Sequence, residues 1–465
     1  MQRRRGAALL ATLAVGCGGH DFVTRAPGAG RSVAVRNVRV FDARRGVVSA
    51  DLRDVLVRDG RIAAVAPAGA DARGLPETDG RGGVLLPGLV DVHAHTGASP
   101  APPWHTVLPH VDENLGAWLY AGVTTVLDAG SLTPAVFRLR DELRSGRKLG
   151  PHLYAAGPML TSPSGHPASL LRAFLPWYLR WYVISRLTRE LATPADAERA
   201  VRSLLAERPD VVKIAVDETD GVPLPPAVIT AIVMAAHAGG VRTVAHVGSS
   251  ADALAAVRAG VDALFHEPYL EEMSDEAVAA TAAAHVPVVV TLAVWDGVAR
   301  LGRLAPGDLR PLERQVLAAD VIAALGAAPR SAAFAELGAQ REKIAAAHDA
   351  RRRTVAKLRA AGVTILAGSD AANAGDAPGA GLHVEIEKLV DAGLTPGEAL
   401  RTATWENARF LAGEGADFGE LAPGKRADLL LVDGDPTADP TVLDRIAAVW
   451  LDGARLLRHP RPAGG

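Results

Sequence analysis

Eight short apolar runs, each followed by a stretch of helical character, occupy the middle of this 465-residue chain. They end near His95, Asp128, Gly157, Asp217, Val247, His266, Leu292 and Asp370. Strands that alternate with helices predict an α/β fold, and eight such units are the number that closes a barrel. A doubly wound open sheet would place a Gly-rich turn after its first strand, where His93 and His95 stand instead. We therefore predict a (β/α)8 TIM-type barrel over residues 85–416.

Both ends of the chain have a different sequence pattern from the middle. Residues 33–41, 55–57 and 62–65 form short β-rich runs, and similar runs return at 428–432 and 446–451. Turn signals such as Asp59-Gly60 separate them. We predict a small β-sandwich domain built from both termini, over residues 32–84 and 417–460, with a linker over 18–31.

The extreme N-terminus resembles a bacterial lipoprotein signal. Three arginines at positions 3–5 precede an apolar run over residues 6–16, and Cys17 follows. We expect a signal peptide over residues 1–17, lipidation of Cys17, and export to the periplasm or cell envelope. The membrane would then be contacted only through the lipid anchor. The alternative is an N-terminal helix that is kept in the fold.

The charge and the cysteine content exclude several partners and sites. Fifty basic and 52 acidic residues give a net charge of −2, so no overall field favours nucleic acid as a partner. Cys17 is the only cysteine, which excludes an internal disulfide and a cysteine-built zinc site. A metal ion would need His, Asp, Glu or Lys as its ligands.

Four histidines stand at the ends of three of the eight runs. His93 and His95 end the first run, and residues two apart on a strand point to the same side. His246 ends the fifth run and His266 the sixth. Each alone fits a buried core histidine, and about 0.4 His-x-His spacings are expected by chance. Together, at strand ends, they favour a metal site, because neutral imidazole is a common metal ligand.

A carboxylate and an amine occupy two further strand positions. Asp370 ends the eighth run, where it is either a functional group or a helix N-cap. Lys213 lies in the apolar run over residues 211–216, where desolvation would lower its pKa. A neutral amine can take up carbon dioxide, and the resulting carbamate could bridge two divalent ions. The alternative is a lysine whose amine reaches water from the strand end.

In this order along the chain, these six residues resemble the metal ligands of the amidohydrolase superfamily. Supporting motifs are residues 86–91 (LPGLVD), 122–125 (GVTT) and 424–429 (GKRADL). The similarity extends over about residues 33–456 and is to the branch of imidazolonepropionase-like proteins and metal-dependent dipeptidases.

The resemblance implies two divalent metal ions, most often zinc, and hydrolysis of a C–N bond in a small amide or peptide-like substrate. His93, His95 and Asp370 would hold one ion and His246 and His266 the other. Carboxylated Lys213 and a hydroxide would bridge them. Asp370 would also be catalytic, moving a proton from the nucleophile to the leaving nitrogen. His166 corresponds to a histidine that is often near the substrate in this branch, although its local sequence fits a surface loop.

Three departures from the branch bear on the substrate. Phe265 precedes His266 where many relatives have Glu, and Asp217-Glu218-Thr219 replaces a Ser/Gly-rich turn. No tyrosine lies between Lys213 and His246, which weighs against a dipeptide as the substrate. The alternatives are a one-metal cyclic amidohydrolase or deaminase with unmodified Lys213, and a non-catalytic surface solute-binding lipoprotein.

An aromatic segment over residues 174–182 (FLPWYLRWY) has no assigned role. It fits ordinary helix packing, a pocket wall or contact with a membrane.

Overall fold

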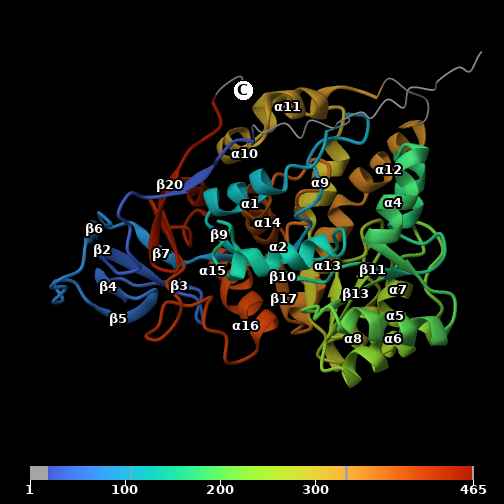
Figure 1. The fold of residues 1–465 in the computed structure, drawn as a ribbon, viewed down its shortest axis with the longest axis horizontal. Coiled ribbons are helices and arrows are strands. Elements are labelled where there is room, and N and C mark those ends of the chain that lie inside the picture. The colour runs from blue at the N-terminus through green and yellow to red at the C-terminus, as the bar shows by residue number, and fades with distance from the viewer. Residues whose placement is uncertain (1–18, 106, 330–333, 463–465) are drawn as a thin grey trace, which may run out of the picture.

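The computed structural model describes residues 19–105, 107–329 and 334–462. Parallel strands surrounded by helices form the larger part of the molecule, and a mainly antiparallel sheet lies at one end (Figure 1). The predicted signal peptide and Cys17 lie outside the described residues. Within the described ranges, no helix has the length and apolar content needed to cross a bilayer.

The described parallel strands are β8 (Leu89–Ala94), β9 (Val123–Asp128), β10 (His152–Ala155), β11 (Met159–Thr161), β12 (Thr188–Glu190), β13 (Val212–Val216), β14 (Thr243–Val247), β15 (Ala263–Phe265), β16 (Val288–Val290) and β17 (Ile365–Ala367). Eight of these ten coincide with the predicted runs, whereas β11 and β12 have no counterpart among them. Those from β13 to β17 are buried along their whole length, as is typical of parallel strands covered by helices. The predicted α/β class with parallel strands is confirmed.

The ladder of hydrogen bonds is not continuous. It is interrupted after the third predicted run, because β10 pairs with β9 whereas the next strand, β11, pairs with β13 and β12. The described strands therefore form a three-stranded sheet, β10-β9-β8, and a seven-stranded sheet, β12-β11-β13-β14-β15-β16-β17. A single parallel bridge between Ala94 and Ala371 links the end of β8 to the segment after β17. The sheets are parallel as predicted, but they do not close into one continuous barrel.

Helices follow the strands along the chain. They are α1 (Val111–Tyr120), α2 (Ala135–Arg144), α3 (Ala168–Phe174), α4 (Trp177–Leu187), α5 (Pro194–Leu205), α6 (Pro226–Ala238), α7 (Ser250–Arg258), α8 (Asp275–Ala283), α9 (Leu292–Arg300), α10 (Pro311–Val316), α11 (Ala319–Gly326), α12 (Ala335–Ala346), α13 (His348–Ala360), α14 (Ala380–Asp391), α15 (Pro396–Arg401) and α16 (Asn407–Ala412). The chain also contains the short 3-10 helices η1 (Pro306–Asp308) and η4 (Pro440–Asp444) and the π-helix η3 (Thr402–Glu406). Thr193, Ser249 and Thr395 begin α5, α7 and α15 with capping boxes that satisfy free backbone N–H groups.

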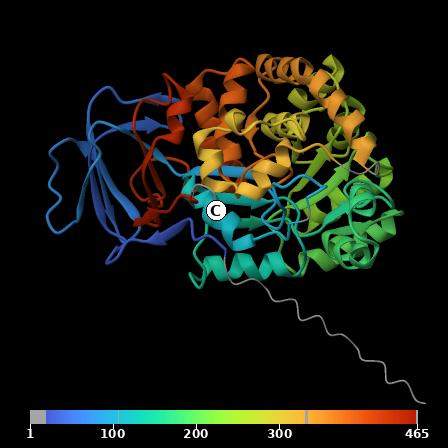
Figure 2. The same ribbon diagram turned by 90° about the horizontal axis from the view of Figure 1, so that it is seen from above.

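The sheet at the end of the molecule is made from strands near both ends of the described chain, drawn in blue and red and lying side by side in two views (Figures 1 and 2). Its strands are β1 (Val23–Arg25), β2 (Val33–Asp42), β3 (Val47–Val48), β4 (Arg53–Arg58), β5 (Arg61–Pro67), β6 (Glu77–Asp79), β7 (Val84–Pro87), β18 (Leu429–Val432), β19 (Ile446–Leu451) and β20 (Ala454–Arg458). Pairing of β18 with β7 and of β1 with β20 joins the two ends. Strand β1 falls inside the segment expected to be a linker. The ten strands belong to one connected sheet, so a two-layered sandwich stays a prediction.

Candidate metal centre

The first and last strands of the parallel core bring two histidines and a carboxylate together. His93 lies on β8, His95 directly follows it, and Asp370 follows β17. Asp370 Oδ1 lies 3.0 Å from His95 Nε2 and 3.4 Å from His93 Nε2. Asp370 Oδ2 lies 4.0 Å from Nε2 of His266, which follows β15.

Lys213 and His246 reach the same point from β13 and β14. The two strands pair in parallel, with Ala215 opposite His246. Lys213 Nζ lies 3.3 Å from His93 Nε2, and the rings of His246 and His266 are 4.5 Å apart. All six residues expected from the sequence thus converge at one end of the parallel strands.

Three of the histidine rings are held by a partner on their outer side. His95 Nδ1 lies 2.8 Å from Gly130 O, and His266 Nδ1 lies 2.6 Å from Thr291 Oγ1. His246 Nε2 lies 3.0 Å from Asp217 Oδ2. Such partners fix the orientation of metal-binding histidines and leave the second ring nitrogen available to an ion. The donor set of imidazole, carboxylate and amine therefore fits a divalent metal of the zinc type.

The electrostatics favour the protonation states that bind metal. Burial lowers the pKa of His93, His266 and Lys213 well below their ordinary values. Burial, together with His166, lowers the pKa of His246 to about 4. Metals bind neutral imidazole, and carbamate formation needs a neutral amine. Protons therefore compete weakly for these nitrogens.

His95 differs from the other three rings. Burial alone would lower the pKa of His95, but the hydrogen bond and charge of Asp370 outweigh burial and raise that pKa. The pair His95–Asp370 is thus the place where positive charge is best tolerated in the centre. The negative charge of Asp370 would likewise stabilise a metal ion bound between the two side chains.

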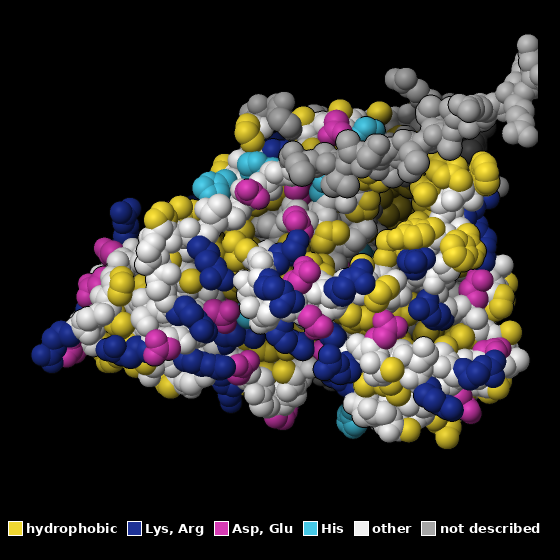
Figure 3. Space-filling model, viewed as in Figure 1, with side chains coloured by type: hydrophobic (Ala, Val, Ile, Leu, Met, Phe, Trp, Pro, Cys, Tyr) yellow, Lys and Arg dark blue, Asp and Glu magenta, His cyan; other side chains and the backbone are white. Residues whose placement is uncertain are grey.

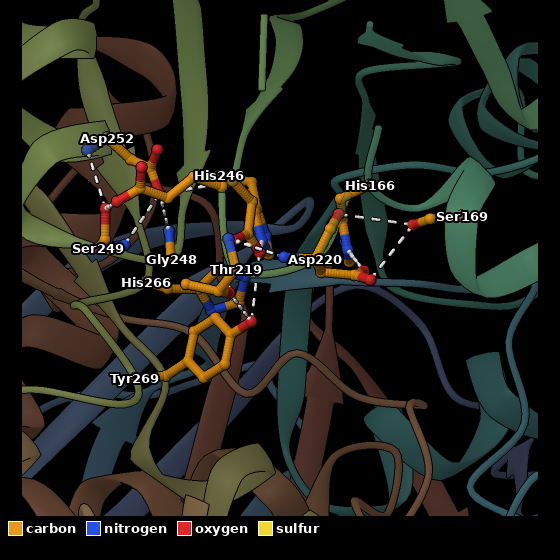
Figure 4. Close-up of polar contacts among 12 residues, drawn as sticks. His166, Ser169, Thr219, Asp220, His246, Gly248, Ser249, Asp252, His266 and Tyr269 are labelled. Carbon is orange, nitrogen blue, oxygen red and sulfur yellow. Dashed lines mark hydrogen bonds and ion pairs between the residues drawn. The ribbon is translucent and has the colours of Figure 1, made fainter. Parts of the chain in front are cut away.

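His166 lies against the centre, although its local sequence fits a surface loop. Its ring stacks on that of His246, with centroids 4.2 Å apart and planes 10° from parallel. His166 Nδ1 lies 2.6 Å from Asp220 Oδ2, and the hydroxyl of Ser169 donates to the same carboxylate (Figure 4). Two groups of residues each offer three possible metal-ligand atoms, one from each residue, that lie within 4.8 Å of one another. One group is His166, His246 and Asp217, and the other is His93, His266 and Asp370.

Comparison with known proteins gives the family. A model described as the amidohydrolase family matches residues 84–456, which include all six residues of the centre and His166. The chain belongs to the amidohydrolase family. The resemblance found in the sequence is confirmed at this level, and the imidazolonepropionase-like branch is not.

Curated relatives of this amidohydrolase include a protein without a described function and an enzyme. An uncharacterized protein of Mycobacterium tuberculosis is 27% identical over 434 residues, covering 90% of this chain and 96% of the relative. The ochratoxinase of Aspergillus niger is 25% identical over 409 residues, covering 81% of this chain and 76% of the relative.

Solved structures support a TIM-barrel-like fold. A putative prolidase from Bifidobacterium longum is 25% identical, with a TM-score of 0.70 over 93% of this chain and 96% of that chain. A Xaa-Pro dipeptidase with bound methionine has a TM-score of 0.73 at 21% identity, over 92% of this chain and all of that chain, and shows the fold alone. The family, together with the likeness to the putative prolidase, supports a hydrolase that acts on C–N bonds.

Several residues of the amidohydrolase site were missed by reasoning from the sequence. The sequence marks Asp217-Glu218-Thr219 as a departure without a role, whereas the structure places Asp217 beside His246 and the next residue, Asp220, beside His166. The hydroxyl of Tyr269 donates to Asp217 Oδ2 at 3.4 Å, and its ring stacks on that of Trp295 at 4.1 Å. The sequence has no tyrosine between Lys213 and His246, but Tyr269, three residues after His266, reaches the turn after β13 in the fold.

Buried Asp91 ties the first strand of the core to the last. It accepts hydrogen bonds from the backbone N–H of His93 and from both the backbone N–H and the hydroxyl of Ser369. Trp118 Nε1 donates to its second oxygen at 3.4 Å. Burial raises the pKa of Asp91 to about 6 despite these donors. The carboxylate therefore fixes His93 and Asp370 relative to each other through their backbones.

Phe265, a departure from the family pattern, forms part of the wall of the centre. Its ring lies 4.1 Å from Lys213 Nζ and 4.7 Å from the ring of His93. The aromatic side chain keeps water from the amine on this side, which contributes to the desolvation of Lys213.

Two residues of the centre adopt a left-handed backbone conformation. His266 has φ 77° and Asp370 has φ 64°. This region is uncommon for residues other than glycine, and residues held there cluster at functional sites. Hydrogen bonds hold both in place: the N–H of His266 donates to Val289 O and the N–H of Asp370 to His93 O. The strand ends thus turn these side chains inward.

Proposed function

We propose that this amidohydrolase cleaves a C–N bond in a small amide or peptide-like substrate with the help of two divalent metal ions. The observation that carries the proposal is the convergence of four imidazoles, one carboxylate and one buried amine at the ends of five parallel strands. The proposal includes closure of the strands into a (β/α)8 barrel and membership of the imidazolonepropionase-like and dipeptidase branch.

The residues divide between the two ions as the family resemblance suggests. His93, His95 and Asp370 would hold one ion, His246 and His266 the other, and carboxylated Lys213 would bridge them. Bound zinc-type ions lower the pKa of a water molecule and polarise a carbonyl group.

The carboxylate of Asp370 is suited to proton transfer. Its two oxygens face His95 and His266, and the amide of Asn373 donates to Oδ1 at 2.9 Å. A carboxylate fixed in this way can accept a proton from the attacking water and pass it to the leaving nitrogen. We therefore assign Asp370 as the general base and general acid.

His166 is positioned to bind substrate. Asp220 accepts a hydrogen bond from Nδ1, which leaves the Nε2 side of the ring for a substrate group. The relatives named ochratoxinase and prolidase support an amide or peptide-like substrate, and the position of Tyr269 removes one argument against a dipeptide.

Metal analysis and a substrate screen test the proposal. Reconstitution with zinc and bicarbonate should give two ions per chain, and Lys213→Ala should give at most one. Lys148→Ala, at a lysine that pairs with Asp112 away from the centre, is the control and should keep two. The screen should include N-acyl amino acids, dipeptides, cyclic amides and lactones. One ion in the wild type, or two in Lys213→Ala, would contradict the bridge.

Export with a lipid on Cys17 is part of the same proposal, since the arginines and apolar run before Cys17 support it. Metabolic labelling with palmitate in a bacterial host should mark the wild type and not Cys17→Ser. Labelling that persists in Cys17→Ser would refute lipidation at this residue.

A further inference from the structure

Helix α4 exposes an unusual concentration of large apolar side chains. In the described part of the chain, five of the eleven exposed large hydrophobic residues lie within six positions of this helix. Their exposed fractions are Trp177 80%, Tyr178 66%, Leu179 39%, Trp181 77% and Tyr182 47%. Hydrophobic side chains gather on this face over the position of α4 (Figure 3). A patch of this kind on a soluble surface indicates an interaction site.

The aromatic rings form two neighbouring rows along the helix. Trp177 and Trp181, and likewise Tyr178 and Tyr182, are four residues apart and so lie one above the other. Within α4 only Ile184 is buried. The outward face of the helix is therefore not part of the core.

The charged residues of α3 and α4 are all positive. Residues 168–187 contain three arginines and no Asp or Glu. Arg172 pairs with Glu190 at 2.7 Å. Arg180 donates to Leu175 O, and the Arg186 guanidinium stacks 4.2 Å over the ring of Tyr182. Neither Arg180 nor Arg186 has a carboxylate partner among the described residues.

We propose that α4 docks this protein onto an anionic phospholipid bilayer. Tryptophan and tyrosine prefer the interface between water and lipid, because each ring has an apolar body and a polar group. Arginines are attracted to anionic headgroups. A short helix with aromatic and basic side chains and no acidic ones lies in the plane of such an interface.

The size of the patch distinguishes a bilayer from a second copy of the chain. A helix of 11 residues is about 16 Å long and about 10 Å wide, whereas a stable protein interface buries roughly 800 Å² on each partner. The helix alone is too small for such an interface. A bilayer needs no shape complementarity and accepts a single helix.

Docking would orient the candidate site. Helix α3 begins two residues after His166, and α4 begins three residues after the end of α3, so a short segment connects His166 to the patch. The ring of Phe174, at the end of α3, stacks on that of Phe334 at 5.7 Å, which holds this segment in place. Docking through α4 would therefore bring the segment that carries His166 towards the lipid. This inference depends neither on the lipid anchor nor on the catalytic assignment.

Vesicle sedimentation tests the inference with the full chain carrying Cys17→Ser, so that no acyl chain contributes. Vesicles of phosphatidylcholine with phosphatidylglycerol should bind the protein at least tenfold more tightly than phosphatidylcholine alone, and 0.5 M salt should weaken binding. Trp177→Ala/Trp181→Ala should reduce binding at least tenfold. Met234→Ala, at a residue of α6 that is 67% exposed, should leave it unchanged.

Circular dichroism and metal content should be the same in all variants, which separates loss of docking from loss of fold. Equal vesicle binding by the double variant, or no binding by the parent, would overturn the proposal. So would a dimer in sedimentation equilibrium that the double variant dissociates, since the patch would then be an interface between two copies.

Discussion

The two halves of the candidate centre are built differently. His93, His95 and Asp370 come from β8 and the end of β17, and Asp91 fixes them through four buried donor groups. His246 and His166 instead depend on Asp217 and Asp220, which lie on the turn after β13. The first half is held by strands and the second by a turn. In the proposed function, proton transfer belongs to the strand half, which holds Asp370, and substrate binding to the turn half, which holds His166.

The buried carboxyl groups beside the two halves differ in the number of hydrogen bonds that they accept. Asp91 is surrounded by donors, whereas Glu267 accepts one hydrogen bond, from Thr291 N at 3.3 Å, and its Oε1 is buried without a partner among the described residues. Burial raises the pKa of Glu267 from its usual 4.5 to about 7. Burial raises the pKa of Asp91 to about 6 as well, so an ionised carboxylate is costly behind both halves.

The largest expected effect is in the strand half. Asp370→Asn keeps the size of the side chain but removes the proton acceptor, so turnover should fall by about 10²- to 10⁴-fold. The measurement is kcat on the best substrate of the screen, with Asp391→Asn on α14 as the control. Retention of full kcat in Asp370→Asn would remove Asp370 from the proposed mechanism.

Glu267→Gln should change how stability depends on pH. The pKa of Glu267 is raised in the folded state, so the folded protein prefers the protonated form. Wild-type stability should therefore fall as pH rises from about 4.5 to about 7, by up to about 3 kcal/mol. Urea unfolding from pH 4.5 to 8 measures this slope, which should be smaller in Glu267→Gln. Identical slopes would mean that Glu267 does not titrate in this range.

Asp217→Asn should weaken metal retention in the turn half. Loss of the charge behind His246 should reduce metal affinity by about 10- to 100-fold. Metal content after dialysis against a chelator is the measurement. Asp262→Asn is a matched control, because Asp262 pairs with His237 in a histidine–carboxylate contact of 2.8 Å away from the centre. Equal metal loss from both variants would contradict a specific role for Asp217.

Asp220→Asn should have the smallest effect and should leave the metals in place. The substitution weakens the hydrogen bond that orients the His166 ring, so kcat/KM should fall by about tenfold. The fall should come mainly from KM if His166 binds substrate in the ground state. Loss of metal in Asp220→Asn would show that this carboxylate supports the centre rather than the substrate.

Much of the fold could be predicted from local patterns. The eight apolar runs mark eight of the described parallel strands, because strands buried on both faces need continuous apolar residues. Strands β11 and β12 were not predicted, since each has only three residues, which is too few for a recognisable pattern. Strand β1 was missed because its pairing partner, β20, lies more than 400 residues away.

Which side chains stand on or next to the strands follows from local sequence, because strand periodicity and apolar runs are local properties. The spacing of His93 and His95, the place of Lys213 in its strand and the position of Asp370 could be predicted for that reason. Which carboxylate supports which histidine depends on the packed fold. Asp217 with His246, Asp220 with His166 and Asp91 with Ser369 are pairs between separate segments, and their contacts exist only after the strands have packed together.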